Sequence, residues 1–413
     1  MKTILTTFTF LLISLAAFTQ ELSKEAWLED LEEYKTGLEE KHIDVYNRIS
    51  KDDFEKEWNA IKNSLEQKFD LEISIELMRL TRKIGDGHTA ISFRNLETHH
   101  FPFDLQNFEG SWCVIKIIEK YHHLLGQKLV QINGQSIDDV AAKVGEVAQF
   151  VENRYSQVIR TAQNLTFSEL LFGLKITSEK TEATFTFQDE TGKQTIEKMG
   201  AVNNGELENE KFSELKISIP GIVHPDNSEE NGFWYTPISG TNALYIHFES
   251  YPAFEEMLKI SEEIVGTIFQ NNIRQLVIDL RNNGGGDLYI GLVLANALNM
   301  ADPVDWKSSV YVLADNVTFS AATSNTALFR ELLNAKIVGE PTGSNPTGYQ
   351  DMDTFKLPNS KLVICYSKRY FRIQETTTQG IQPDVPMKYE WQSFLQGKDN
   401  MLEWVVNDTE SKN

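Results

Sequence analysis

The chain has 413 residues, of which 41% are apolar and 11% aromatic, and its 60 acidic against 39 basic residues give a formal net charge of −21. This length allows two or three domains, and the apolar content is enough to pack their cores. Because no basic stripe interrupts the negative charge, nucleic acid and anionic membrane surfaces are excluded as favoured partners. The acidic residues are spread along the chain, which indicates a well-solvated surface.

The N-terminus is typical of a secretory signal peptide. Lys2 supplies a positive start, Ile4–Ala17 is apolar apart from scattered hydroxyls, and small residues precede a cut before Gln20. An apolar N-terminal helix of the mature protein is the alternative. No other stretch approaches the ~20 apolar residues of a membrane-spanning helix. We therefore expect residues 1–19 to be removed and the mature protein to be exported, periplasmic or extracellular, and not membrane-spanning.

Helical spacing dominates the next part of the chain. Apolar residues recur at three- and four-residue steps over 27–38, 51–69 and 72–84. This pattern predicts a helical bundle over residues 20–98 that ends in the turn Gly85–Thr89.

Strand-like patterns begin at about Phe101. The apolar stretch Leu125–Ile137 contains the tight-turn pair Asn-Gly, and a hairpin is predicted around 189–193. These patterns predict a second module over 99–200. The polar, turn-rich stretch 201–230 is predicted to link this module to the last one.

Strands alternate with helices in the last module, residues 231–413. This alternation predicts parallel, crossover-connected strands and an α/β core. The two cysteines, Cys113 and Cys365, could pair, but no cluster in the chain has metal-ligand spacing, so no metal is predicted. The predicted order is strand 276–280, helix 288–299, strand 308–314, helix 320–333 and strand 336–339.

Three places could carry chemistry. Gly284–Gly286 come directly after an apolar strand, and such a run suits positive φ or close approach of bare N–H groups to a ligand. Ser320 opens a later helix, where the helix dipole favours negative charge. Together they suggest an acyl-transfer site, whereas the simpler interpretations are a tight turn and a helix N-cap. His88, in Gly-Asp-Gly-His, is either a base or an ordinary turn histidine, and spacing alone does not bring it to Ser320.

The ordered combination of motifs resembles the S41 family of serine peptidases, which includes the C-terminal processing proteases and the core of tricorn protease. Leu276–Asp287 resembles the family's strand and glycine turn. Thr318–Thr323, with Gly339–Gly343 after it, resembles the nucleophile helix and the next strand. Leu125–Ile137 resembles part of a PDZ-like module, and Gly380–Val385 resembles the Gly-x-x-Pro-Asp segment near the end of these domains.

This resemblance implies the fold class and the activity. The fold would be α/β with several modules (α+β overall): a helical bundle, a PDZ-like module over 99–200 and a crotonase-like ββα-type catalytic core over 231–413. The activity would be that of a serine endopeptidase that cleaves protein or peptide substrates through an acyl-enzyme, without a cofactor. The oligomeric state is left open.

One position departs from the processing proteases. Their lysine base falls here at about Asn345, and an amide is no base at neutral pH. The tricorn-like branch uses a histidine, and His88 fits that place. The chain therefore resembles the Ser–His branch more than the Ser–Lys branch. An imidazole, with an ordinary pKa of ~6.5, suits a general base near neutral pH.

The resemblance also assigns the remaining roles. Ser320 would be the nucleophile and His88 the general base, and the N–H of Ala321 with that of Gly285 or Gly286 would form the oxyanion hole.

The third catalytic residue is the least defined of the set. Glu375 is the nearest acid before the Gly-x-x-Pro-Asp segment, although Thr376–Thr378 intervene and change its offset. Asp86 could instead orient the ring of His88 or stabilise its turn. Two functions without catalysis stay open: an apolar-ligand carrier on the same scaffold, as in the interphotoreceptor retinoid-binding proteins, and an inactive relative that binds peptides.

Overall fold

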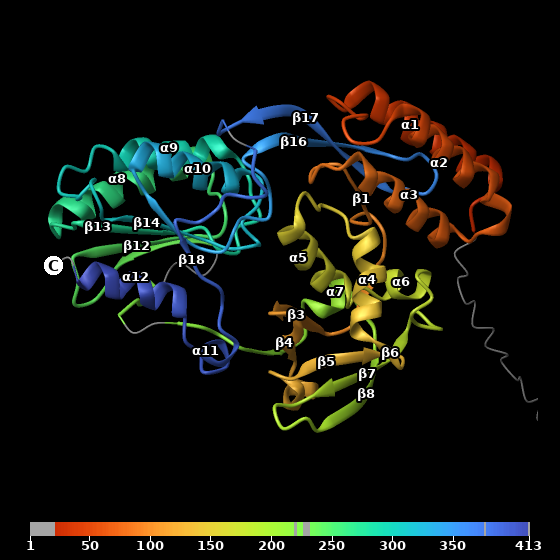
Figure 1. Cartoon of the computed structure of the whole chain (residues 1–413), viewed down its shortest axis with the longest axis horizontal. Coiled ribbons are helices and arrows are strands. Elements are labelled where there is room, and N and C mark those ends of the chain that lie inside the picture. Colours follow the sequence, from red (N-terminus) through yellow and green to blue (C-terminus); the bar gives the residue numbers. More distant parts are fainter. Residues whose placement is uncertain (1–20, 219–220, 226–231, 376, 412–413) are drawn as a thin grey trace, which may run out of the picture.

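The structure is a computed structural model that describes residues 21–218, 221–225, 232–375 and 377–411. The predicted signal peptide, residues 1–19, lies outside the described residues. Within them, no helix combines the length and apolar character needed to cross a membrane. The chain forms two lobes joined along one side by a long hairpin (Figure 1).

Helices form the N-terminal part, as their apolar spacing predicts. The last of the three ends at Gly85, which takes the left-handed conformation (φ 83°) common after a helix. The second helix is shorter than the predicted 51–69, because the chain turns at Ser64 into a short 3-10 helix, Leu65–Gln67. The three helices are α1 (Lys24–Lys41), α2 (Lys51–Asn63) and α3 (Asp70–Ile84).

The second module is a seven-stranded antiparallel sheet with helices packed against it. Its path runs β10-β4-β5-β7-β8, with β3 beside β4 and β6 beside β5. The members are β3 (Phe103–Phe108), β4 (Ser111–Ile118), β5 (Lys128–Ile132), β6 (Gln135–Ser136), β7 (Glu182–Gln188), β8 (Gln194–Gly200), β10 (Phe212–Glu214), α4 (Ile137–Val147), α5 (Arg154–Asn164) and α6 (Ser168–Gly173).

The stretch 201–230, predicted as a linker, contributes ordered elements. Strand β10 pairs with β4, and β9 (Val202–Asn203) pairs with β2 (His99–His100), with the short helix α7 (Asn204–Leu207) after it. One hydrophobic cluster runs from the helical bundle into the second module, for example from Leu77 to Val144. The two predicted modules therefore share a core.

The second lobe is the predicted α/β core. Strands β12 to β15 and β18 are parallel, and β11 pairs antiparallel with β12 at the edge. Helices α8, α9 and α10 cover one face and α12 the other (Figure 1). The strands and helices predicted over 276–339 are confirmed to within two residues. The elements are β11 (Phe233–Pro237), β12 (Ala243–Phe248), β13 (Gln275–Asp279), β14 (Val310–Ala314), β15 (Lys336–Gly339), β18 (Val385–Pro386), α8 (Phe254–Gln270), α9 (Leu288–Leu298), α10 (Ala321–Leu333), α11 (Trp391–Leu395) and α12 (Asn400–Glu410).

A long hairpin ties the two lobes together. Strands β16 (Thr347–Lys356) and β17 (Val363–Arg372) leave the α/β core, and β17 pairs at its far end with β1 (Ala90–Ser92). Figure 1 shows this hairpin reaching from the α/β lobe to α1. Because β1 begins two residues after His88, the hairpin joins the histidine turn to the lobe that carries Ser320.

Cys113 and Cys365, which could have paired, do not form a disulfide. Cys113 lies on β4 and Cys365 on β17, and both thiols are free and buried.

Candidate active site

Ser320 occupies the sharp turn between β14 and α10. Its backbone is strained, with φ 51° and ψ −122°, in a region that non-glycine residues rarely adopt. Ser320 stands at the N-cap position of α10, yet its side chain accepts no capping hydrogen bond. The N-cap interpretation therefore does not account for this hydroxyl. A strained serine between a strand and a helix is the arrangement that exposes a nucleophile in other hydrolase folds.

His88 lies directly beside this serine, although 232 residues separate them in sequence. Its Nε2 is 2.9 Å from Ser320 Oγ. The ring packs against Phe319, with ring centroids 5.4 Å apart, and is almost fully buried. Burial lowers the pKa of His88 and outweighs the nearby charge of Asp86, which acts to raise it. The imidazole is therefore neutral at pH 7, the state that can accept a proton.

Asp86 holds the turn that carries His88. Its Oδ1 accepts hydrogen bonds from the backbone N–H groups of His88 (3.0 Å) and Thr89 (2.8 Å) and from the hydroxyl of Ser367 (2.8 Å). Burial alone would raise the pKa of Asp86, but the hydrogen bonds that its carboxylate accepts, the one from His42 first, outweigh it and leave the pKa lowered. The carboxylate stabilises the turn rather than contacting the ring of His88.

A second histidine completes this arrangement from the end of α1. His42 Nε2 lies 3.0 Å from Asp86 Oδ2, and both side chains are buried. The Nδ1 of His42 accepts the N–H of Asp44 at 2.9 Å, so the ring proton must sit on Nε2 and be donated to Asp86. Sequence analysis did not single out His42, because no local pattern connects it with a turn 44 residues later.

The glycine turn presses against the nucleophile. Gly285 has φ 104°, and a Cβ built on it would lie 2.6 Å from the Cβ of Ser320, so only glycine fits. The N–H of Gly285 donates to Asn283 Oδ1 at 2.9 Å. The N–H groups of Gly286 and Ala321 donate no hydrogen bond to any described residue. Ala321 follows Ser320 directly as the first residue of α10, and Gly286 follows Gly285, which lies against Ser320.

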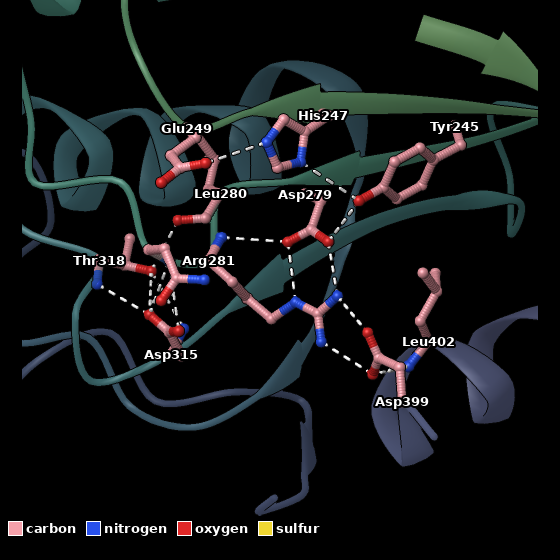
Figure 2. Close-up of polar contacts among 11 residues, drawn as sticks. Tyr245, His247, Glu249, Asp279, Leu280, Arg281, Asp315, Thr318, Asp399 and Leu402 are labelled. Carbon is pink, nitrogen blue, oxygen red and sulfur yellow. Dashed lines mark hydrogen bonds and ion pairs between the residues drawn. The ribbon is translucent and has the colours of Figure 1, made fainter. Parts of the chain in front are cut away.

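Asp315 forms hydrogen bonds with both the glycine turn after β13 and the turn before Ser320. It accepts the backbone N–H of Asn282 (3.2 Å) and of Thr318 (3.0 Å), one from each turn. The Thr318 hydroxyl donates to the carbonyl of Leu280 at 2.9 Å (Figure 2). Burial raises the pKa of Asp315 to about 6. These contacts set the glycine run and the nucleophile in one rigid unit.

A buried ion cluster underlies the glycine turn. Arg281 donates to Asp279 through Nε (2.9 Å) and Nη2 (2.6 Å), and to Asp399 through Nη1 (2.9 Å) and Nη2 (2.7 Å), as Figure 2 shows. Asp399 also caps α12 by accepting the N–H of Leu402. The bidentate geometry satisfies the guanidinium, which a buried charge requires. This cluster joins the C-terminal helix to the strand that leads into the site.

The position of the processing-protease lysine holds a structural amide. Asn345 Oδ1 accepts the N–H of Gly380 (2.9 Å) and the side-chain amide of Asn153 (3.1 Å). The preceding residue, Ser344, accepts the backbone N–H of Ser320 at 2.7 Å. This segment therefore supports the nucleophile but supplies no base.

Glu375 lies apart from these contacts. Its side chain is exposed, and it has no hydrogen bond or ion pair with another described residue. The Nδ1 of His88 is buried without a hydrogen bond of good geometry to the described residues. A backbone interaction with Tyr349 acts to raise the pKa of His88, against the larger effect of burial. The catalytic role of Glu375 stays a prediction.

Comparisons with known proteins bear on the family and the fold of the chain. Residues 296–387, which include Ser320, match the profile of Peptidase family S41. Mature CPAF has a similar structure at 12% identity, with a TM-score of 0.65 over 94% of this chain and 97% of that one. A structure of mature CPAF complexed with lactacystin gives 12% identity and a TM-score of 0.63, over 94% of this chain and 98% of that one.

A third structure, the photosystem II D1 C-terminal processing protease, matches at 12% identity and a TM-score of 0.45, over 89% of this chain and 94% of that one. The family match covers residues 296–387, which include Ser320, and the fold is shared with mature CPAF over nearly the whole chain. The segment that holds Ser320 is therefore similar to peptidase family S41, and the chain as a whole has the fold of mature CPAF.

Proposed function

We propose that this protein is an exported serine endopeptidase in which Ser320 is the nucleophile and His88 the general base. The observation that carries the proposal is the 2.9 Å distance between His88 Nε2 and Ser320 Oγ, with the serine held at a strained positive φ. This is the nucleophile–base contact that acyl transfer requires.

The contacts support an acyl-enzyme reaction. His88 takes the proton of Ser320 as Oγ attacks the peptide carbonyl, then gives it to the leaving amine. Water then attacks the acyl-enzyme, with His88 again as the base. The N–H groups of Gly286 and Ala321 are the donors available to the oxyanion, since Gly285 gives its N–H to Asn283. Loss of one such donor typically lowers turnover by ~10²–10³-fold.

The finer parts of the proposal rest on resemblance. The Ser–His pair, with Asn345 where a lysine base would lie, supports the tricorn-like branch. The second module would be PDZ-like and the α/β core crotonase-like, and the 1–19 segment would direct export to the periplasm or the extracellular space. Peptide or protein chains would be the substrates, without a cofactor. Glu375 would need to move toward His88 to serve as the third catalytic residue.

A fluorophosphonate probe tests the mechanism. Wild-type protein should be labelled, Ser320→Ala should not be, and His88→Ala should be labelled much more slowly. His123→Ala, at an exposed histidine, is the matched control. Folded wild-type protein that resists the probe and cleaves no peptide, yet saturably binds an apolar ligand, would show that the retinoid-carrier alternative is right.

A further inference from the structure

A cavity of about 580 Å³ lies between β1 and α5, and neither His88 nor Ser320 lines it. Strand β1 starts two residues after His88, and its residues Ile91 and Ser92 line the cavity. Arg160, on α5, lines it as well, with its guanidinium carbon 5.4 Å from the ring centroid of Phe319, the residue before the nucleophile. The ring of Phe319 therefore contacts both His88 and Arg160.

Arg160 is held in place by neutral groups. Its Nε donates to the carbonyl of Phe150 at 3.4 Å, and its Nη1 donates to Gln163 Oε1 at 2.9 Å. The ring centroid of Phe150 lies 5.9 Å from the guanidinium carbon, on top of the contact with Phe319. These contacts fix the orientation of the guanidinium, because two hydrogen bonds and two aromatic rings restrict it.

The cation nevertheless lacks an anionic partner within the described part of the chain. Among those residues, Arg160 forms no ion pair, and its Nη2 has no hydrogen-bond acceptor. The chain has 60 acidic residues, so an available carboxylate is not scarce. A largely buried cation is costly without a partner, and burial lowers the pKa of Arg160 accordingly. An oriented guanidinium with a free donor is suited to a carboxylate from outside the chain.

The rest of the lining is consistent with such a ligand. Arg94 lies at the rim and contacts only the hydroxyl of Thr354 through Nη2. The one acidic residue of the lining, Glu97, is exposed and accepts a hydrogen bond from Asn203. Phe93 and Phe167 pack edge-to-face in the wall, which suits the aliphatic part of a side chain.

We propose that this cavity is a substrate subsite in which Arg160 binds the carboxylate of an acidic side chain close to the scissile bond. The inference rests on the proposed peptidase function and names the substrate class that the site prefers. Arg160 is a specificity-determining residue in this scheme, and it takes no part in proton transfer.

Paired fluorogenic peptides test this assignment. One glutamate is moved along the peptide on either side of the cleaved bond, and each peptide is compared with its glutamine counterpart. Wild-type enzyme should show a kcat/KM at least about tenfold higher for glutamate at one position, as a charged hydrogen bond provides. Arg160→Met should bring the glutamate-to-glutamine ratio close to one, whatever its absolute rates. Arg160→Lys should keep part of the ratio.

Two controls make the result specific. Arg154→Met, at an exposed arginine of the same helix, should leave the ratio unchanged. Peptides with free and amidated C-termini separate an acidic side chain from a terminal carboxylate. A preference that depends only on the free terminus, or a glutamate-to-glutamine ratio equal in wild type and Arg160→Met, would overturn the proposal.

Binding to Ser320→Ala keeps this test separate from catalysis. The full-length variant should bind the best glutamate peptide at least about tenfold more tightly than its glutamine counterpart, and Arg160→Met should remove the difference. If the wild type neither labels nor cleaves but this binding difference is present, the proposed function fails and the subsite stands. If the enzyme labels and cleaves but the difference is absent, the subsite fails alone.

Discussion

The two halves of the catalytic pair are held in different ways. The serine turn is fixed within one lobe, because Asp315 and Thr318 join it to the glycine turn over a few tens of residues. The histidine turn is fixed by Asp86 through contacts from α1 and β17, at the ends of two separate segments. The nucleophile is therefore set by local folding, whereas the base is set only once both lobes and the hairpin have assembled.

We expect the largest loss of activity from a change beside Ser320. Gly285→Ala would put a methyl group 2.6 Å from Ser320 Cβ and 2.9 Å from the carbonyl of Phe319, at a φ that alanine avoids. We expect kcat/KM to fall by about 100-fold or more, since small misplacements of reacting groups cost this much. Gly284→Ala, where a Cβ meets open space, is the control. Equal activity of the two variants in a peptide assay would show that the close approach does not matter.

Asp86→Asn tests the histidine half. In one orientation the new NH₂ group would face the N–H of His42, and two donors would oppose each other. In the other it would face the backbone N–H groups of His88 and Thr89, which would lose their acceptor. The turn therefore loses contacts in either orientation. We expect a loss of about 3 kcal/mol in unfolding free energy, as for a broken buried pair, and a fall in kcat of some tens-fold. Denaturant unfolding and peptide cleavage measure the two. Asp138→Asn, at an exposed site, should change neither.

His42 should have a smaller effect of the same kind. His42→Leu removes the donor to Asp86 and should lower kcat by about tenfold, with KM nearly unchanged. His42→Gln can place an amide N–H near the position of Nε2 and should restore part of the loss. A purely space-filling role for His42 predicts instead that leucine and glutamine behave alike. His123→Leu, at an exposed histidine, serves as the control.

The smallest expected effect is a shift in the pH dependence of kcat/KM. Because burial lowers the pKa of His88, the acidic limb of kcat/KM should have its midpoint below the ordinary ~6.5 of histidine. The base is active when neutral, so a lower pKa extends activity toward acid. The charge of Asp86 acts to raise this pKa, so Asp86→Asn should move the midpoint lower still. A midpoint above 6.5 in the wild type would contradict this account of the site.

Sequence analysis predicted the α/β core and named Ser320 and His88, which the structure places in contact, but it did not predict the contacts that support them. The strands and helices over 276–339 were predictable because parallel α/β units carry strong local patterns of apolar strands and amphipathic helices. The hairpin β16–β17 was missed, although it spans both lobes. Its strands are partly polar and buried only in part, with Val363–Ser367 of β17 in the interior, and they pair with each other and with β1, which no local pattern records.

The site residues also differ in whether a local sequence pattern indicates them. The glycine run is visible in sequence, because φ above zero and a close approach to Ser320 require glycine at position 285, and Ser320 is visible as a serine that opens a predicted helix. His42, Ser367 and Asp315 had no such signal, since a buried hydrogen-bond partner can come from any segment that folding brings near. Glu375 was suggested by its position in the motif order, but its side chain is exposed and forms no hydrogen bond or ion pair with His88.

The sequence by itself determined the elements of the α/β core, the glycine turn, the place of Ser320 at the start of a helix and the resemblance to the S41 peptidases, because each depends on local residue types and their order. Only the tertiary structure decided that His88 meets Ser320 at 2.9 Å, that Asp86 and His42 hold the histidine turn, and that Arg160 faces a cavity without an anion from the described residues. Contacts between segments hundreds of residues apart are set by how the modules pack, and packing depends on whole surfaces rather than on any single stretch.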